Sequence, residues 1–263
     1  MTPSKLNLNG WKTMADTSKF IKSYNARKQR TEEKRQKILE FISAETFTVT
    51  ELVAELLGVS RQAAHKTLKA MEKDELIKLY NLNFELAQAG KQTIWGLTPT
   101  GALMAADLSD FQVDFYEAGR VAITTIAHSL AVQRVKVKGL AMGFTNWKSS
   151  RKMRQIADKA RTTWLQVPDA IATNTNGEIV AFEVERTAKT PKRYHEILNN
   201  YAEMFLDRTV SQVYYICPEK LTKRLEMLFS KIETMTVKGQ TQPVHPKVRE
   251  KIKFMSFEEW EKL

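Results

Sequence analysis

The stretch TELVAELLGVSRQAAHKTLKAME, residues 50–72, decides the fold of the first half of the chain. Its apolar residues recur at helical spacing on both sides of Gly58, which predicts two short helices joined by a tight turn. Gly58 has no Cβ and therefore permits the left-handed backbone that ends the first helix. Ser60 is a suitable N-cap residue for the second helix, which we expect over Arg61 to about Lys73.

The flanking segments extend this pattern. Ile38, Leu39 and Ile42 predict a helix that begins near Thr31, and residues 48–51 match a capping box for the next helix, in which Thr48 and Glu51 satisfy each other's amides. We expect a β-hairpin with strands at 77–80 and 92–97 and its tip at Gly90, then a short helix from Thr98 to about Leu108. This order resembles the winged helix-turn-helix superfamily.

The outward face of the second helix predicts a DNA contact. In the winged helix-turn-helix fold this helix enters the major groove, and its face here is polar and basic. The net charge of +11 also favours a phosphate-rich partner, because bound phosphates release counterions. The residues expected to read base edges are Arg61, Gln62 and His65. General affinity is expected from Lys66, Lys69 and, in the hairpin, Lys91.

Composition excludes several other classes of protein. No apolar run approaches the length of a membrane span, so no membrane insertion is expected, and the basic N-terminus lacks the apolar core of a secretory signal. The single cysteine, Cys217, rules out an internal disulfide and fits a reducing cytoplasm; we expect it to be buried in a strand. Residues 1–30 are polar and basic, and we expect a flexible arm there.

The remaining residues predict a second domain of different character. We assign residues 31–108 to the DNA-binding domain and 109–263 to an α/β domain, so that the whole chain is of the α+β class. Residues Asn174 to Gly177 strongly predict the turn of a β-hairpin. The expected elements are a helix over 114–133, a strand at 135–137, a basic helix within 147–160, a hairpin of 167–172 and 178–185, a helix over 193–206, a strand at 212–216 and a helix over 220–232.

Three carboxylates carry the chemistry of this second domain. Residues two apart on a strand point to the same face, so Glu183 and Glu185 project together, and the hairpin can bring Asp169 alongside them. Three converging carboxylates repel one another unless a cation lies between them, and a hard divalent ion, Mg²⁺ or Mn²⁺, is the simplest answer. Such an ion would activate a water for attack on a phosphodiester. Otherwise Asp169 is a turn residue and the two glutamates lie on a solvated strand face.

These residues resemble a known pattern. Pro168-Asp169 and Glu183-x-Glu185 resemble the two half-motifs of the PD-(D/E)xK nuclease superfamily, which implies a restriction-endonuclease-like αβββαβ domain over residues 114–220. Glu185 stands where that pattern usually has lysine, so Lys189 is the candidate for the missing positive charge. His128, on the helix before the first strand, is a further candidate catalytic residue, and Glu117 is another on the same helix.

The combination of features is more specific than either half. A winged helix followed by a loop with Trp147, then PDA, EVER-T-x-K and RYxxILxxY, is similar over residues 35–220 to the MOBC family of plasmid mobilisation relaxases and to the related replication-relaxation proteins. The resemblance implies that Asp169, Glu183 and Glu185 form the metal site of an endonuclease, a hydrolase that nicks one strand at an origin of transfer. It implies double-stranded and locally single-stranded DNA as substrate, and an accessory relaxosome protein and a coupling protein as partners.

Several residues near the carboxylates have two interpretations. Arg186, Lys192 and Arg193 are placed to hold phosphate oxygens. Tyr194 and Tyr201, seven apart on one helix face, are candidate nucleophiles for a tyrosyl–DNA intermediate, or they pack that helix on the sheet and water is the nucleophile. Trp147 either stacks on an unpaired base or belongs to the core.

Two further functions stay open. Glu185 in place of lysine is compatible with a non-catalytic DNA-binding regulator that carries a degenerate nuclease domain, and a replication initiator would share the winged helix without needing convergent carboxylates. Dependence on a divalent metal separates an enzyme from both. The sequence does not fix the DNA target or the oligomeric state.

Overall fold

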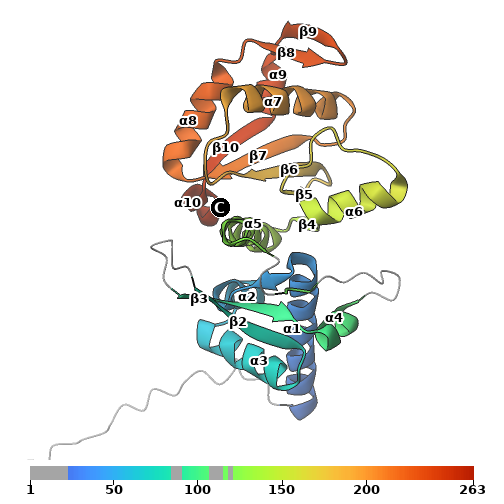
Figure 1. Ribbon diagram of the computed structural model, residues 1–263, viewed down its shortest axis with the longest axis vertical. Helices are drawn as coiled ribbons and strands as arrows, with labels where there is room; N and C mark the ends of the chain where they lie inside the picture. Colours follow the sequence, from blue (N-terminus) through green and yellow to red (C-terminus); the bar gives the residue numbers. More distant parts are fainter. Residues whose placement is uncertain (1–22, 84–90, 107–114, 118–120) are drawn as a thin grey trace, which may run out of the picture.

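The computed structural model describes residues 23–83, 91–106, 115–117 and 121–263. It is an α+β fold, as the sequence predicts, in which two units follow one another along the long axis (Figure 1). A three-stranded sheet belongs to the N-terminal unit and a five-stranded sheet to the C-terminal unit, with a two-stranded ribbon at the far end. The predicted domain boundary at residue 108 lies outside the described residues. Within the described ranges, every helix is too short or too polar to cross a membrane.

The N-terminal unit packs four helices around an antiparallel sheet in the order β1-β3-β2. Trp95 of the central strand is fully buried, and its indole Nε1 donates a hydrogen bond to the Thr50 hydroxyl at 3.0 Å, which fixes the sheet to the second helix. The elements are α1 (Tyr24–Glu45), β1 (Phe47–Thr48), α2 (Thr50–Leu57), α3 (Arg61–Lys73), β2 (Ile77–Asn83), β3 (Lys91–Leu97) and α4 (Pro99–Ala105).

The turn between α2 and α3 forms as predicted, but the capping box before α2 does not. Gly58 has φ 61° and ψ 41°, in the left-handed region, and the Ser60 side chain accepts a hydrogen bond from the Ala63 amide. By contrast, Val49 precedes α2 without a side-chain cap, and Thr48 is buried in β1 opposite Trp95. The prediction failed because strand pairing holds Thr48 in the sheet.

Two other N-terminal predictions need correction or extension. Helix α1 begins at Tyr24, so residues 24–30, expected in a flexible arm, are helical; residues 1–22 lie outside the described part of the chain. The hairpin strands are longer than predicted, running to Asn83 and from Lys91, and the predicted tip at Gly90 lies outside the described residues. The side chain of Lys91 is also outside them.

The C-terminal unit is a mixed sheet with helices on both faces. The strand order is β10-β7-β6-β5-β4, with β10, β7 and β6 parallel and β5 and β4 antiparallel to their neighbours. Its elements are α5 (Ile123–Ala141), β4 (Thr145–Ser149), α6 (Ser150–Ala160), β5 (Ala170–Thr173), β6 (Ile179–Val184), α7 (Pro191–Leu206), β7 (Gln212–Cys217), α8 (Glu219–Ser230), β8 (Thr234–Val237), β9 (Gln240–Pro243), α9 (Pro246–Glu250), β10 (Ile252–Ser256) and α10 (Phe257–Lys262).

The two faces of this sheet hold separate cores. Phe182 and Val184 of β6 pack with Val135 of α5 and Trp260 of α10 on one face. Ala181, which precedes Phe182 on the strand, packs with residues of α7 and α8 on the other face. Figure 1 shows α7 and α8 on the side of the sheet away from α5. Because side chains alternate along a strand, Glu183 points towards α7.

The first strand of this unit was predicted wrongly. Residues 135–137 belong to α5, and the first strand is β4. Val135 faces the sheet while Val137 faces the N-terminal unit, so an apolar-polar-apolar triplet typical of a strand lies on a helix buried on two sides. The helix expected from residue 114 begins only at Ile123; before it, Tyr116 packs on Phe47 and Tyr80. The ribbon β8–β9 and strand β10 were not predicted.

Helix α5 joins the two units. The Gln133 amide donates to the Phe47 carbonyl at 2.8 Å, and the Lys136 ammonium contacts the Glu45 carboxylate at 2.6 Å, with both side chains of the pair less than 9% exposed. A shared apolar cluster includes Ile126 and Val137 of α5 together with Leu52 of α2. The N-terminal unit is therefore packed on the helix that also covers the five-stranded sheet.

Candidate active site and DNA-binding surface

The three predicted carboxylates lie at one end of β5 and β6. Glu183 is near the end of β6 and Glu185 follows it, and both are buried. Asp169 immediately precedes β5, whose Ala170 pairs with Phe182, so the same register places Asp169 opposite Glu183. The hairpin therefore brings the predicted residues to one edge of the sheet, on the side that α7 covers.

Glu183 is held by two side-chain donors. The Tyr201 hydroxyl donates to its Oε1 at 2.6 Å and the Gln166 amide donates to the same oxygen at 3.0 Å. Burial raises the pKa of Glu183 to about 7, and the neighbouring charge of Asp169 adds to the shift against the two hydrogen bonds. A carboxylate with this pKa exchanges its proton near neutral pH.

Asp169 connects the hairpin to α5. The His128 Nε2 lies 3.0 Å from its Oδ1, and the Val184 amide donates to its Oδ2 at 2.8 Å. The hydrogen bond with Asp169 raises the pKa of His128, with burial opposing the shift. The His128 side chain remains 38% exposed, so the sequence-predicted histidine meets the sequence-predicted aspartate at the open side of the site.

Glu185 is paired with the predicted lysine. The Lys189 ammonium contacts its Oε1, although Glu185 is buried and Lys189 is 40% exposed. The Lys189 backbone amide donates to the Tyr194 hydroxyl at 2.9 Å, which fixes the segment between β6 and α7. A cation four residues later in the chain thus lies beside Glu185.

A buried hydroxyl beside the carboxylates lacks a hydrogen-bond partner in the described part of the chain. Tyr215 of β7 pairs with Glu183 of β6 in the parallel ladder, and its hydroxyl is fully buried and unsatisfied. Burial, followed by the charges of Glu183 and Glu185, raises the Tyr215 pKa far above its usual range. The Tyr215 hydroxyl is therefore a hydrogen-bond donor without an acceptor, and it faces the acidic cluster. Sequence reasoning missed Tyr215 and Gln166, because only the tertiary pairing brings them to Glu183.

The carboxylate oxygens are of the kind that binds a hard divalent metal ion, but the three carboxylates do not form a three-ligand site. Within residues 23–83, 91–106, 115–117 and 121–263, no group of three His, Cys, Asp or Glu side chains is placed to hold one ion. Mg²⁺, however, is commonly bound through one or two carboxylates, with water and substrate phosphate completing its shell. Asp169 and Glu183 lie opposite each other and supply two such oxygen donors, while Lys189 engages Glu185.

The two candidate nucleophilic tyrosines are buried, and their hydroxyls are hydrogen-bonded inside the protein. Tyr194 and Tyr201 both face the carboxylates from α7, as their spacing predicts, and both are fully buried. Their hydroxyls are engaged with the Lys189 amide and with Glu183, and burial raises the pKa of Tyr194 to about 12 and that of Tyr201 well above its usual value. The Trp147 ring stacks on the Phe182 ring in the core, with 4.7 Å between the ring centroids. Glu117 lies near Tyr80 of the N-terminal unit, away from the site.

The predicted DNA-binding residues of α3 are all on its exposed face. Arg61 pairs with Glu51 at 2.5 Å and Lys69 with Glu72 at 2.7 Å, and the Lys69 ammonium lies 5.5 Å from the Trp95 ring centre. Gln62, His65 and Lys66 are exposed.

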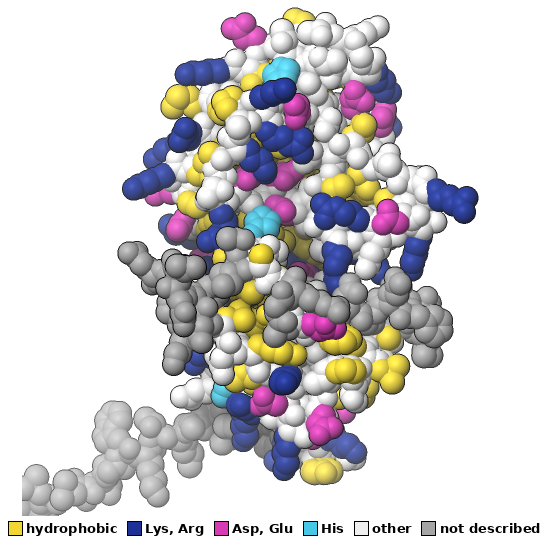
Figure 2. All heavy atoms as spheres, viewed as in Figure 1, with side chains coloured by type: hydrophobic (Ala, Val, Ile, Leu, Met, Phe, Trp, Pro, Cys, Tyr) yellow, Lys and Arg dark blue, Asp and Glu magenta, His cyan; other side chains and the backbone are white. Residues whose placement is uncertain are grey.

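In the C-terminal unit, Arg186, Lys192 and Arg193 are exposed near the carboxylates, with Arg193 paired to Glu196. Figure 2 shows Lys and Arg side chains spread over this unit around acidic ones near its centre. The lone Cys217 is buried in β7, as predicted.

Comparison with known proteins gives one family. A family model described as replication-relaxation matches residues 39–218. No curated protein matches the chain. Among solved structures, a mutant of Lactococcus lactis ZitR in apo form is 19% identical, with a TM-score of 0.22 over 52% of this chain and 86% of that chain. This TM-score is too low to bear on the fold.

Proposed function

The chain belongs to the replication-relaxation family, and from that premise we propose that it is a relaxase, a metal-dependent endonuclease that nicks one DNA strand at a plasmid origin of transfer. The observation that supports this proposal most is the meeting of Asp169, Glu183 and Glu185 with Lys189 and His128 at one end of the sheet. A buried carboxylate with a raised pKa, here Glu183, beside a half-exposed histidine and a lysine is typical of a reaction site.

In this proposal Asp169 and Glu183 would hold Mg²⁺ or Mn²⁺, which when bound would supply an activated water and offset charge on the phosphate. Burial, and then the repulsion between the two carboxylates, raises the pKa of Glu183, and a cation there would balance that repulsion. Lys189, fixed by Glu185, offers its ammonium to the phosphate oxygens. Because His128 Nε2 is engaged with Asp169, its Nδ1 is the atom that exchanges a proton with the reacting group.

Water is the proposed nucleophile. Tyr194 and Tyr201 are fully buried, and their hydroxyls are engaged inside the protein. A tyrosine that attacks DNA must present its oxygen to the phosphate, and a raised pKa makes that oxygen a weaker nucleophile at neutral pH. Hydrolysis by a metal-activated water needs neither tyrosine to move.

DNA recognition is assigned to α3 of a winged helix-turn-helix. Its exposed cations are held by carboxylates at the surface, and such pairs are weak enough to exchange for phosphates. The substrate is duplex DNA that becomes locally single-stranded at the origin, and a mobilisation role requires an accessory relaxosome protein and a coupling protein. The second candidate function is a non-catalytic DNA-binding regulator, which the pairing of Glu185 with Lys189 also permits.

The test is the conversion of supercoiled, origin-bearing plasmid to open circle by the purified chain, with Mg²⁺ and with chelator. Asp169→Asn and Glu183→Gln should each lower the rate by at least about a hundredfold, and chelator should abolish nicking. Glu178→Gln is the matched control, because Glu178 is an exposed carboxylate at the turn of the same hairpin. Plasmid that is bound but stays supercoiled with Mg²⁺ and partner proteins present would favour the regulator.

A further inference from the structure

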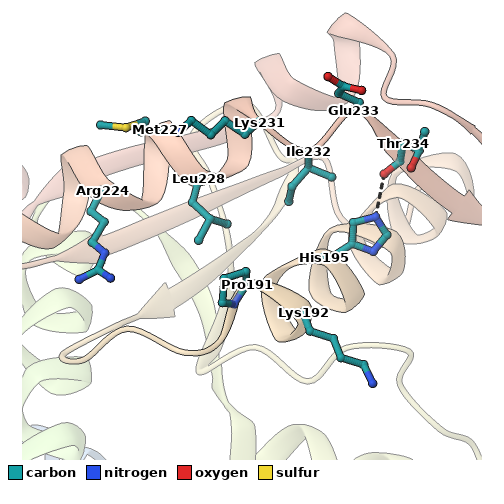
Figure 3. Close-up of a pocket in the computed structure, with 10 residues that line it drawn as sticks. All are labelled: Pro191, Lys192, His195, Arg224, Met227, Leu228, Lys231, Ile232, Glu233 and Thr234. Carbon is teal, nitrogen blue, oxygen red and sulfur yellow. Dashed lines mark hydrogen bonds between the residues drawn. The ribbon is translucent and has the colours of Figure 1, made fainter.

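A groove between α7 and α8 lies next to the proposed active site. It encloses about 720 Å³, and Figure 3 shows side chains of the two helices and of the segment entering β8 around it. Pro191 and Lys192, which line it, follow Lys189 by two and three residues along the chain. The groove therefore begins at the end of α7 that follows the Lys189 segment.

The rim of the groove is basic and unbalanced. Lys192 of α7, Arg224 of α8 and Lys231 at the end of α8 line it, against a single acidic residue, Glu233. Among the residues that the structure describes, none of these three cations forms an ion pair. Three uncompensated cations around one concavity favour an anionic occupant.

The floor of the groove is apolar. Leu228 and Ile232 point towards α7, and Met227, which also lines the groove, is 56% exposed. The His195 ring is held by a 2.9 Å contact between its Nε2 and the Thr234 carbonyl, which fixes the ring at the wall. Exposed thioether and aliphatic groups between cations suit a ligand that carries apolar surface and negative charge in alternation.

We propose that this α7–α8 groove binds an unpaired stretch of the substrate DNA strand, with phosphates on Lys192, Arg224 and Lys231 and bases against Met227 and His195. A duplex keeps its bases stacked inside and would leave the apolar floor without a partner, whereas unpaired bases expose apolar faces that stack on side chains. The inference rests on the proposed function for the identity of the strand, but its binding step does not require cleavage.

A dye placed in the groove tests the location directly. Cys217 is fully buried, so Met227→Cys provides an accessible thiol for a fluorophore, and Leu206→Cys, at the other end of α7 and 61% exposed, is the matched control. In chelator, oligothymidylate should change the fluorescence of the dye at position 227 and leave that at position 206 unchanged. A response to polyglutamate in place of oligothymidylate, or equal responses at both positions, would overturn the proposal.

A charge-matched pair of variants tests the cations. Arg224→Ala with Lys231→Ala should weaken oligothymidylate binding about tenfold and flatten its salt dependence by about 1.4 units of slope, since each single-strand phosphate contact contributes about 0.7. Lys220→Ala with Lys223→Ala removes the same charge from exposed positions of α8 outside the groove and should change little.

Equal losses in the two double variants would overturn the groove as the site. Because oligothymidylate binding is measured in chelator, a chain that shows these effects but never nicks plasmid would refute the endonuclease and leave the groove in place. A chain that nicks plasmid but binds oligothymidylate equally well with or without Arg224 and Lys231 would refute the groove alone.

Discussion

Charged side chains are used in opposite ways on α3 and around α5 and β6. On α3, Arg61 and Lys69 pair with carboxylates at the surface, and the Arg61 side chain is 69% exposed. In the other region, Lys136 and Glu45 pair in the interior between the two units, and Glu183 is 4% exposed. Exposed pairs are weak and can be given up to a phosphate, whereas buried charges depend on fixed partners. The first region suits exchange with DNA, and the second fixes geometry and protonation.

The largest effect is expected from breaking the buried pair. Lys136→Met keeps the length of the side chain but leaves the Glu45 carboxylate uncompensated between α5 and α1. Removing one partner of a buried ion pair typically costs about 3–5 kcal/mol, so urea denaturation should show a loss of this size in the free energy of unfolding.

Arg61→Met is the control for that variant, because it breaks an exposed pair by the same kind of substitution. Its cost should stay below about 1 kcal/mol. Similar costs for the two variants would mean that burial does not distinguish the two regions. A stability of Lys136→Met equal to that of the unaltered chain would mean that the two units are not joined through this pair.

A smaller effect, with a definite pH dependence, is expected at Glu183. Its pKa rises from 4.5 to about 7 on folding, mainly by burial. The folded state therefore binds the proton more tightly, and the unaltered chain should lose stability as the pH rises from about 4.5 to about 7. Glu183→Gln removes the ionisation and can still accept from Tyr201 and Gln166.

The variant should therefore match the unaltered chain near pH 4.5 and exceed it at pH 8 by up to about 3 kcal/mol. The measurement is the free energy of unfolding at both pH values, with Glu178→Gln as the exposed control. His128, whose pKa is raised, gives a change of the same sign in both proteins, so the difference between them isolates Glu183. A pH-independent difference would contradict burial as the cause.

The two regions also differ in how far the sequence predicts them. The α2–α3 turn depends on neighbours along the chain, Gly58 and Ser60, and it was predicted to the residue. The carboxylates were predicted because Asp169 and Glu183 meet across a hairpin with a clear turn signal. Tyr215 and Gln166 could not be predicted as their neighbours, since a parallel strand pairing and a loop bring them there.

Errors occurred where tertiary packing overrode a local pattern. Residues 135–137 resemble a strand, but α5 is buried on two sides, so its apolar residues do not follow a single helical stripe. Strand β10 pairs in parallel with β7. A parallel pairing with a strand far away in the sequence has no local turn signal that would predict it. Local signals therefore sufficed for helix ends and hairpins, and failed for elements defined by distant partners.

The smallest expected effect compares two residues that the sequence treats alike. Ser60 and Thr48 were both predicted as caps, but only Ser60 accepts a hydrogen bond from a helix amide, whereas the Thr48 hydroxyl is buried with no hydrogen-bond partner in the described part of the chain. Ser60→Ala should cost about 1 kcal/mol of unfolding free energy. Thr48→Val replaces an unsatisfied hydroxyl by a methyl of similar shape and should be neutral or stabilising by up to about 1 kcal/mol. If urea denaturation gave equal losses for both, Thr48 would act as a cap after all, and β1 would not hold it in the sheet.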